Sequence, residues 1–350
     1  MVTLGESMVT FLPGGPGRLA DVPSFHRAIG GAESNVACAL AAFGHTARWI
    51  SRVGADGFGD HLVERIAGYG VDVTAVRRDP ARPTGVYFRT AGDRGTGAHE
   101  VAYYRAGSAA SAMSVTDVDL TAVRAARVLH LTGITAALSD ECRDLLHTLT
   151  APAPGRPPVS FDVNHRPGLW PDDEAARLLL DLARRADIVF VGADEAEQAW
   201  GATGGPSAIR ELLPEPDVLV VKQGAKGATA FVRRTVTAEA GRVAGPRAAT
   251  APSVFEPALD AAVVATTGAG DAFAAGFLSA TLRGLPVRDR LRHGHLFAAA
   301  ALTTPGDLAP PPARDHADRL AALDDDAWGR LRLGPGWTQA EQAHEEANTP

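Results

Sequence analysis

The sequence predicts an α/β protein in which helices cover both faces of a mostly parallel β-sheet. From residue 45 onward, short apolar segments typical of strands alternate with segments that have helical periodicity. Polar or glycine-rich residues directly follow several of the predicted strands, and ligands bind at this position in such sheets. The length of 350 residues is enough for one large domain or for two smaller ones.

The composition argues against several classes of function. Hydrophobic residues make up 45% and charged residues 21%, as is ordinary for globular proteins. The formal net charge of -7 argues against a nucleic-acid partner, which would require a basic surface. Cys38 and Cys142 are expected to be reduced thiols, and no cysteine–histidine cluster has metal-site spacing. We recognise neither a targeting segment nor an apolar segment of membrane-spanning length, and therefore expect a cytoplasmic protein without a membrane partner.

The individual elements follow from apolar periodicity and from the glycine and proline clusters between them. Strands are expected at residues 2–5, 8–12, 47–53, 84–90, 100–105, 128–131, 159–164, 188–191, 217–222 and 261–265. Helices are expected between the glycine pair at 30–31 and Gly44, at residues 61–69, 139–150, 172–185 and 314–323, and from about 271 onward. Turns are expected at 13–17, 54–59, 91–97 and 223–227. The segments 84–90 and 100–105 interrupt the alternation, which indicates a hairpin in a separate small sheet. The Pro-, Asp- and Glu-rich tail from about residue 334 is expected to be loose.

The segment from Thr266 to Phe273 has the features of an anion site. Gly268 and Gly270 allow a tight turn that leaves backbone N–H groups uncovered. A helix that begins at about Asp271 would direct its unpaired N–H groups and the positive end of its dipole into this turn, where phosphate is the typical ligand. A carboxylate would repel phosphate there. Asp271 is therefore either a helix cap or a general base for a hydroxyl that attacks the phosphate.

A second glycine pair, Gly30 and Gly31, precedes the helix that contains Asn35. Taken alone, this pair indicates no more than a turn between a loop and a helix. Together, however, residues 30–37 and 267–273 resemble the two signatures of the ribokinase-like (PfkB) carbohydrate kinases. The resemblance covers roughly residues 1–310 and implies a ribokinase-like three-layer α/β/α sandwich with a small β-sheet lid. It assigns the lid to residues near 8–26 and 84–105, and it leaves 311–350 as a tail that is partly helical or disordered.

The resemblance also implies roles for the residues of the second signature. Asp271 matches the family's catalytic base, and the N–H groups of Gly268, Ala269 and Gly270 match its anion hole for the migrating phosphoryl group. Phosphoryl transfer depends mainly on positioning and charge stabilisation, which agrees with the interpretation of residues 266–273 as an anion site. Because family members often dimerise through the lid, we expect a homo-oligomer, most simply a dimer.

Within the family, residues 103–111 and 161–170 resemble those of the 2-keto-3-deoxygluconate kinases. This likeness implies a small-molecule sugar or sugar-acid substrate whose binding residues are Gly30, Gly31, Asn35, Tyr87, Tyr103, Arg105 and Arg166. Guanidinium groups suit a carboxylate, although arginines are more often solvated surface residues. Fructokinases carry similar segments, so a fructokinase or another ketose kinase is an alternative. A sugar-binding relative without catalysis is a further one.

The resemblance implies ATP and Mg²⁺ as cofactors. The matching nucleotide-binding residues are Asn164, Lys222, Gly224, Lys226, Gly227 and Thr267. Glu195 matches a glutamate that helps to arrange Mg²⁺, in this case through water, but Gly192 stands where the family usually has its asparagine partner. Ala265 replaces an aspartate that usually contributes to a monovalent-cation site. Both departures concern cations, and neither removes the proposed base or anion hole.

Overall fold

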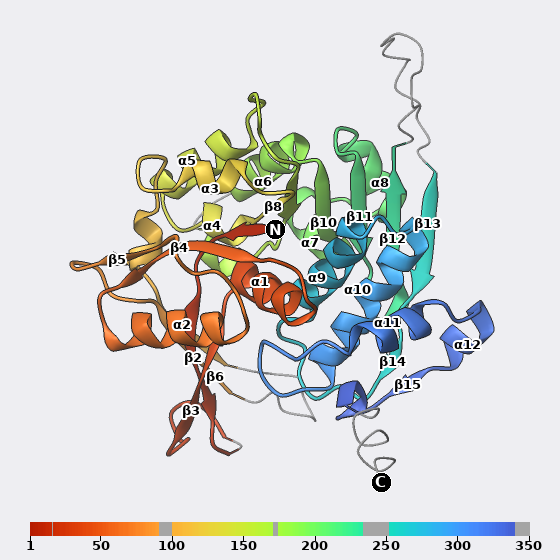
Figure 1. Ribbon diagram of the computed structural model, residues 1–350, viewed down its shortest axis with the longest axis horizontal. Helices are drawn as coiled ribbons and strands as arrows, with labels where there is room; N and C mark the ends of the chain where they lie inside the picture. Colours follow the sequence, from red (N-terminus) through yellow and green to blue (C-terminus); the bar gives the residue numbers. More distant parts are fainter. Residues whose placement is uncertain (16, 91–99, 171–173, 234–251, 340–350) are drawn as a thin grey trace.

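A nine-stranded sheet lies at the centre of the computed structural model, which describes residues 1–15, 17–90, 100–170, 174–233 and 252–339 (Figure 1). In sheet order the strands are β13 (Ser253–Pro257), β12 (Gly227–Val232), β11 (Val218–Lys222), β10 (Ile188–Gly192), β9 (Val159–Asp162), β8 (Leu129–Thr132), β1 (Val2–Leu4), β4 (Arg48–Gly54) and β5 (Val76–Asp79). All neighbours from β11 to β5 are parallel, whereas β12 and β13 pair antiparallel at one edge. The predicted, mostly parallel sheet is confirmed.

Helices cover both faces of this sheet and give the three-layer architecture. One face packs against α1 (Ala32–Ala42), α2 (Gly57–Gly68), α9 (Ala269–Leu282) and α10 (Val287–Leu302). The other face packs against α3 (Leu120–Arg124), α5 (Asp140–Thr150), α6 (Glu174–Arg185), α7 (Ala193–Trp200) and α8 (Gly205–Leu212), while α4 (Gly133–Ala136) follows β8. Side chains alternate between the two faces, as strand geometry requires: Phe190 lies in the first core, and Val189 and Val191 lie in the second.

The segment before the glycine turn at residues 268–270 differs from the prediction. Residues 261–265 were expected to form a strand, but β14 covers only Asp260–Ala261 and pairs with the short strand β15 (Arg332–Leu333). Val263 and Val264 are exposed, and the N–H groups of Val264 and Ala265 donate to the carbonyl of Leu302 instead of to a neighbouring strand. The prediction of a strand at residues 261–265 is therefore wrong beyond Ala261, although the segment is apolar.

Two helices begin earlier than predicted. α9 begins at Ala269 and not at about Asp271, because Gly268 takes up the non-helical N-cap position. α2 begins at Gly57, inside the turn expected at 54–59, where the Asp56 side chain accepts hydrogen bonds from the N–H groups of Phe58 and Gly59. Such an Asp cap satisfies backbone donors that a new helix leaves unpaired. In both cases a residue that can serve as an N-cap precedes the helix by one position.

A separate four-stranded sheet contains the strands β3 (Phe25–Gly30), β2 (Met8–Pro13), β6 (Val86–Arg89) and β7 (Val101–Tyr104), in this order. Strands β6 and β7 pair antiparallel, which confirms the predicted hairpin, while its turn at 91–97 lies outside the described residues. In Figure 1, β2, β3 and β6 extend away from the central sheet below α2. We call β3-β2-β6-β7 the small sheet.

Residues after 310 pack against the α9–α10 side of the protein. The predicted helix at 314–323 is confirmed as α11 (Arg314–Ala321), and it is followed by α12 (Asp325–Arg330). The expectation of a loose tail from about residue 334 does not hold up to residue 339, because Trp337 is only 9% exposed and belongs to the core. Residues 340–350 lie outside the described part, and a domain boundary at 310 stays a prediction. Within the described ranges, no helix is long and apolar enough to cross a membrane.

Candidate functional site

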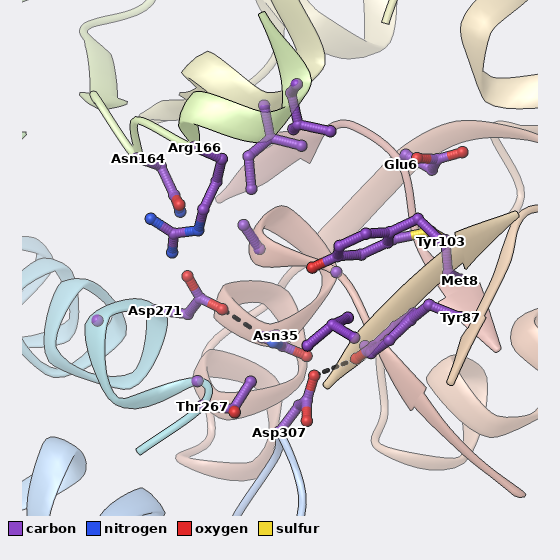
Figure 2. Close-up of a pocket in the computed structure, with 18 of the residues that line it drawn as sticks. Glu6, Met8, Asn35, Tyr87, Tyr103, Asn164, Arg166, Thr267, Asp271 and Asp307 are labelled. Carbon is purple, nitrogen blue, oxygen red and sulfur yellow. Dashed lines mark hydrogen bonds between the residues drawn. The ribbon is translucent and has the colours of Figure 1, made fainter. Parts of the chain in front are cut away.

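A cavity of about 520 Å³ lies between the small sheet and the carboxyl ends of several central strands (Figure 2). Ligands bind at this edge of parallel α/β sheets. Most of the sequence-predicted site residues line it: Gly30, Gly31, Asn35, Tyr87, Tyr103, Arg105, Asn164, Arg166, Glu195, Lys222, Thr267, Gly268, Gly270 and Asp271. Residues that are far apart in the chain thus meet at one place, since Glu6 and Asp307 both line the cavity.

The N-terminus of α9 opens toward the cavity through Gly268. This glycine has φ of 79°, and a Cβ atom there would collide with the backbone carbonyl of Asp307, so no other residue fits without strain. The first helical hydrogen bond runs from the N–H of Ala272 to the carbonyl of Gly268. The preceding N–H groups of Gly270 and Asp271 therefore have no partner within the helix. This arrangement suits an anion.

Asp271 lies in the first turn of α9 and does not cap it, because the N-cap is Gly268. Its Oδ2 atom accepts a hydrogen bond of 2.9 Å from Nδ2 of Asn35 (Figure 2). Burial raises the pKa of Asp271 to about 7; the hydrogen bond from Asn35 opposes this shift, and the negative charge of Asp162 adds to it. A carboxyl group with such a pKa can accept a proton at neutral pH.

Helix α1 positions Asn35 through a buried glutamate. Glu33 is fully buried and accepts hydrogen bonds from the hydroxyl groups of Thr132 and Thr135, at 2.8 and 2.6 Å. These bonds fasten the start of α1 to the end of β8. The glycine pair before α1 is also required by packing, because a Cβ atom at Gly30 would collide with the Tyr87 hydroxyl group. The glycine pair therefore not only forms the turn before α1 but also leaves room for the Tyr87 side chain.

Two carboxylates that line the cavity were not predicted from the sequence, Glu6 and Asp307, and Asp307 joins the small sheet to the α9 side. The Tyr87 hydroxyl donates to Oδ2 of Asp307 (Figure 2). Nη2 of Arg89 lies 2.9 Å from Oδ1 of Asp307. Burial raises the pKa of Asp307, and burial together with the charge of Asp307 holds the pKa of Tyr87 well above its usual value. Asp307 stands alone in the loop after α10, so no local motif in the sequence marks it.

The two predicted arginines each have a carboxylate partner. Nη2 of Arg105 forms an ion pair with Oε2 of Glu6, and both side chains are almost fully buried. Nη1 of Arg166 lies 3.3 Å from Oε1 of Glu195, but the Arg166 side chain is 53% exposed. Arg166 is therefore held less firmly than Arg105. Neither residue is a fully solvated surface arginine, because both line the cavity.

Lys222 and Asn164 reach the cavity from the ends of β11 and β9. Nζ of Lys222 pairs with the buried carboxylate of Asp162 at 2.9 Å, a partner that was absent from the predicted site. Asn164 has φ of 42°, in the left-handed region, and its buried Oδ1 atom has no hydrogen-bond partner among the described residues. Backbone strain of this kind is typical of functional positions.

Four predicted residues do not line the cavity: Ala269, Gly224, Lys226 and Gly227. Lys226 is exposed in a short 3₁₀ turn. Gly227 is the first residue of β12, with φ of 138°, and a Cβ atom there would collide with the Glu256 carbonyl. Its position in the sheet therefore explains why this residue is a glycine.

Glu195 has a structural partner in addition to Arg166. Its Oε2 atom accepts a hydrogen bond of 2.8 Å from the N–H of Gly192 and so caps α7. Among the residues described, no group of three or more His, Cys, Asp or Glu side chains could hold a metal ion. Direct coordination of a metal by a protein cluster is thus not supported, whereas a single carboxylate near a hydrated ion is compatible with this geometry.

Comparison with known proteins supports the resemblance. The family described as pfkB family carbohydrate kinase matches residues 1–314. The 2-dehydro-3-deoxygluconokinase of Bacillus subtilis (strain 168) is 36% identical over 90% of this chain and 93% of the relative, and that of Thermoproteus tenax is 35% identical over 92% and 94%. The solved structure of a PfkB protein from Polaromonas sp. JS666 is similar with a TM-score of 0.75 and 33% identity, covering 91% of this chain and 98% of that one. The chain therefore belongs to the pfkB family and is a carbohydrate kinase, as its two glycine-rich segments predicted.

Proposed function

We propose that this kinase transfers the γ-phosphate of ATP to the terminal hydroxyl group of a sugar acid, 2-keto-3-deoxygluconate (2-dehydro-3-deoxygluconate). The observation that carries this proposal is the presence of two arginines, Arg105 and Arg166, in the same cavity as Asp271. A guanidinium fork suits a carboxylate, which a neutral ketose lacks. The two relatives that are 35–36% identical bear the name of this activity.

In this proposal Asp271 takes the proton from the attacking hydroxyl group. Its pKa of about 7 leaves a substantial fraction ionised at neutral pH, and Asn35 holds its carboxylate in place. The unpaired N–H groups at the start of α9 stabilise the charge of the phosphoryl group as it moves. Lys222 lies beside this turn, where it can attract phosphate oxygens. These residues act by position and charge, and no covalent intermediate is required.

Three residues on or directly after strands of the small sheet complete the proposed sugar side. Tyr103 and Arg105 come from the end of β7 and the residue after it, and Tyr87 comes from β6. The ring of Tyr103 lies 5.8 Å below the Arg105 guanidinium and is 50% exposed, so it offers a surface to a sugar. A fructokinase or another ketose kinase is the alternative, and it would not require both arginines.

Mg²⁺ is the expected cofactor beside ATP, where it would neutralise phosphate charge. Mg²⁺ keeps several of its waters and uses one or two carboxylates together with phosphates. Glu195 lines the cavity as a single carboxylate, and both of its oxygens already contact protein donors. Its contact with the hydrated ion is therefore proposed to be through water.

A dimer formed through the small sheet is part of the proposal. β7 is an edge strand, and Tyr104 on it is 66% exposed. Exposed edge strands with large apolar side chains favour pairing with another chain, here a second copy. Light scattering of the purified protein should give the mass of a dimer, and Tyr104→Ser should shift the equilibrium toward monomer. A monomer at micromolar concentration in the unmodified protein would contradict this part.

The pH dependence tests the base. The logarithm of kcat/KM should rise with pH and level off above about pH 7, as Asp271 loses its proton. Asn35→Ala removes a hydrogen bond that favours the carboxylate, so the pKa of Asp271 should rise and the acid limb should move to higher pH. Asp271→Asn should lose this limb and lower kcat by ~10²-fold or more. An acid limb at the same pH in Asn35→Ala would contradict the assignment.

The substrate is tested with a sugar acid and a neutral sugar. Arg166→Ala should lower kcat/KM for 2-keto-3-deoxygluconate by roughly 10-fold. This value is at the lower end of the range for the loss of a charge-assisted hydrogen bond, because the Arg166 side chain is half exposed. It should change kcat/KM for fructose much less. Arg184→Ala is the matched control, since Arg184 also faces a glutamate but lies outside the cavity. Wild-type preference for fructose would establish the ketose-kinase alternative, and no ADP release with any sugar would favour a non-catalytic relative.

The metal proposal is tested by titration. Glu195→Gln keeps an acceptor for the helix cap but removes the charge, so the Mg²⁺ concentration for half-maximal rate should rise. Asp194→Asn removes a neighbouring carboxylate of the same helix that does not line the cavity, and it should leave the titration unchanged. Superimposable Mg²⁺ curves for wild type and Glu195→Gln would reduce Glu195 to a helix cap.

A further inference from the structure

Glu6 is a buried carboxylate of the cavity to which nothing so far assigns a role. It lies two residues after the end of β1, lines the cavity and is 3% exposed. Its surroundings leave no spare room: a Cβ atom at Gly85 would lie 2.9 Å from Oε1, and one at Gly31 would lie 2.5 Å from the carbonyl oxygen of Glu6. Burial of a carboxylate is costly unless it is paired and hydrogen-bonded. The contacts of Glu6 therefore indicate what it does.

Both carboxylate oxygens of Glu6 have partners on one segment. Oε1 accepts a hydrogen bond of 2.6 Å from the Ser108 hydroxyl, and Oε2 pairs with Nη2 of Arg105. The Arg105 side chain is 10% exposed, and its contact with Glu6 is an ion pair without a hydrogen bond, since the buried Nε and Nη2 atoms have no hydrogen-bond acceptor among the described residues. Glu6 thus holds the guanidinium at one nitrogen and does not engage all of its donors.

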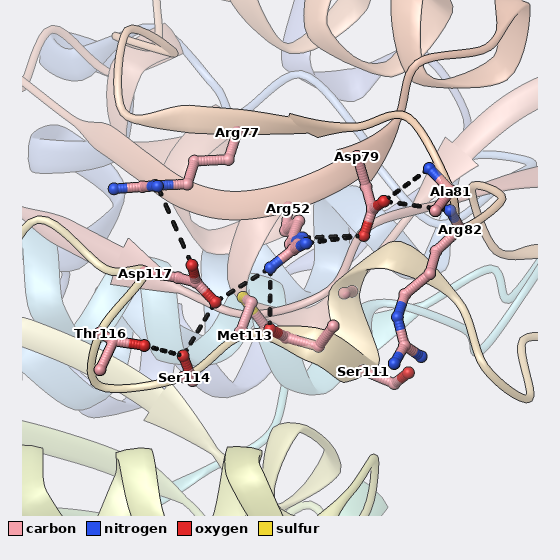
Figure 3. A network of polar contacts seen from close by, with 12 residues as sticks. Arg52, Arg77, Asp79, Ala81, Arg82, Ser111, Met113, Ser114, Thr116 and Asp117 are labelled. Atoms are coloured by element: carbon pink, nitrogen blue, oxygen red, sulfur yellow. Dashed lines mark hydrogen bonds and ion pairs between the residues drawn. The ribbon is translucent and has the colours of Figure 1, made fainter.

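The backbone of this segment is fastened independently of Glu6. Arg52 donates to the carbonyl of Ala112 at 3.2 Å and to Asp117 at 2.9 Å, and it also binds Asp79 (Figure 3). The N–H of Ala109 donates to the carbonyl of Pro83 at 2.8 Å. Because these contacts fix the chain after Arg105, the ion pair with Glu6 acts on the orientation of the side chain rather than on the path of the backbone.

A purely stabilising role would not require this pair. A buried ion pair is often no more stabilising than apolar residues of similar volume, whereas removal of one partner leaves an uncompensated charge. We infer that Glu6 is a positioning residue: it holds the Arg105 guanidinium where its remaining donors meet the carboxylate of a sugar acid, and it thereby sets the preference for acids over neutral sugars. This inference rests on the proposed function, because it assumes that Arg105 binds a carboxylate.

A double-mutant cycle with two sugars tests the inference. Glu6→Ala should lower kcat/KM for 2-keto-3-deoxygluconate by about 10-fold or more, mainly through KM, as expected for a misdirected charge-assisted hydrogen bond. The loss for fructose should be much smaller. In an Arg105→Ala background the same substitution should change kcat/KM for the acid by less than about 3-fold, because the group that Glu6 orients is gone. Glu6→Gln keeps an acceptor of the same shape and should fall between wild type and Glu6→Ala.

The control variant is Asp117→Asn, which loosens the same segment from outside the cavity. It should lower the thermal stability and leave the ratio of kcat/KM values for the two sugars unchanged. Circular dichroism checks that each variant is folded, and if Glu6→Ala is not, the cycle is run with Glu6→Gln. Equal losses on both sugars, or independent effects of Glu6 and Arg105, would overturn the inference while wild-type turnover of the acid upholds the proposed function. A wild type that phosphorylates fructose but not the acid would overturn both.

Discussion

The close approach of the Gly268 turn to the backbone of Asp307 is the constraint on which the site depends. Gly268 has a positive φ, and only a residue without a Cβ atom can lie against the Asp307 carbonyl. This contact fixes where α9 begins. The start of α9 in turn places two unpaired N–H groups and the Asp271 side chain at the cavity. The anion site and the proton acceptor proposed above would therefore both depend on the geometry of this one turn.

The cavity is organised as a set of ion pairs. Each cation that lines it in the described part of the chain has a carboxylate partner: Arg105 with Glu6, Arg89 with Asp307, Lys222 with Asp162, and Arg166 with Glu195. Three of these carboxylates are almost fully buried, so their partners are held before any ligand arrives. Pre-oriented charges need little reorganisation during a reaction. Arg166 is the exception, since its exposed side chain can turn toward an entering anion.

The sequence revealed the parts of the site that depend on local structure. The two glycine segments could be predicted because tight turns and helix starts restrict which residues fit, and Asn35 and Asp271 lie within those segments. The predicted strands of the central sheet were recognisable from short apolar segments, but residues 261–265 show that composition alone does not determine burial. Gly227 lies in a glycine-rich turn like that of Gly268 and Gly270, yet the close approach of the Glu256 carbonyl explains why it is a glycine.

The residues that sequence analysis missed are partners across long distances in the chain. Glu6 meets Ser108 and Arg105, Asp162 meets Lys222, and Asp307 meets Arg89, and no spacing rule links such positions. A single carboxylate in a loop looks the same whether it is solvated or buried. Only the fold, which brings the loop after α10 against the small sheet, distinguishes the two cases for Asp307.

Asp307 also connects the two sides of the cavity. Its carboxylate binds Tyr87 and Arg89 of β6 in the small sheet, while its backbone carbonyl lies behind Gly268 at the start of α9. A displacement of β6 would therefore reach the same residue that lies behind the turn at Gly268. Because the side chain of Asp307 is buried and both of its oxygens are bonded, it has little freedom to absorb such a displacement by itself. One carboxylate residue therefore contacts both the small sheet, on the proposed sugar side, and the start of α9, on the proposed phosphate side.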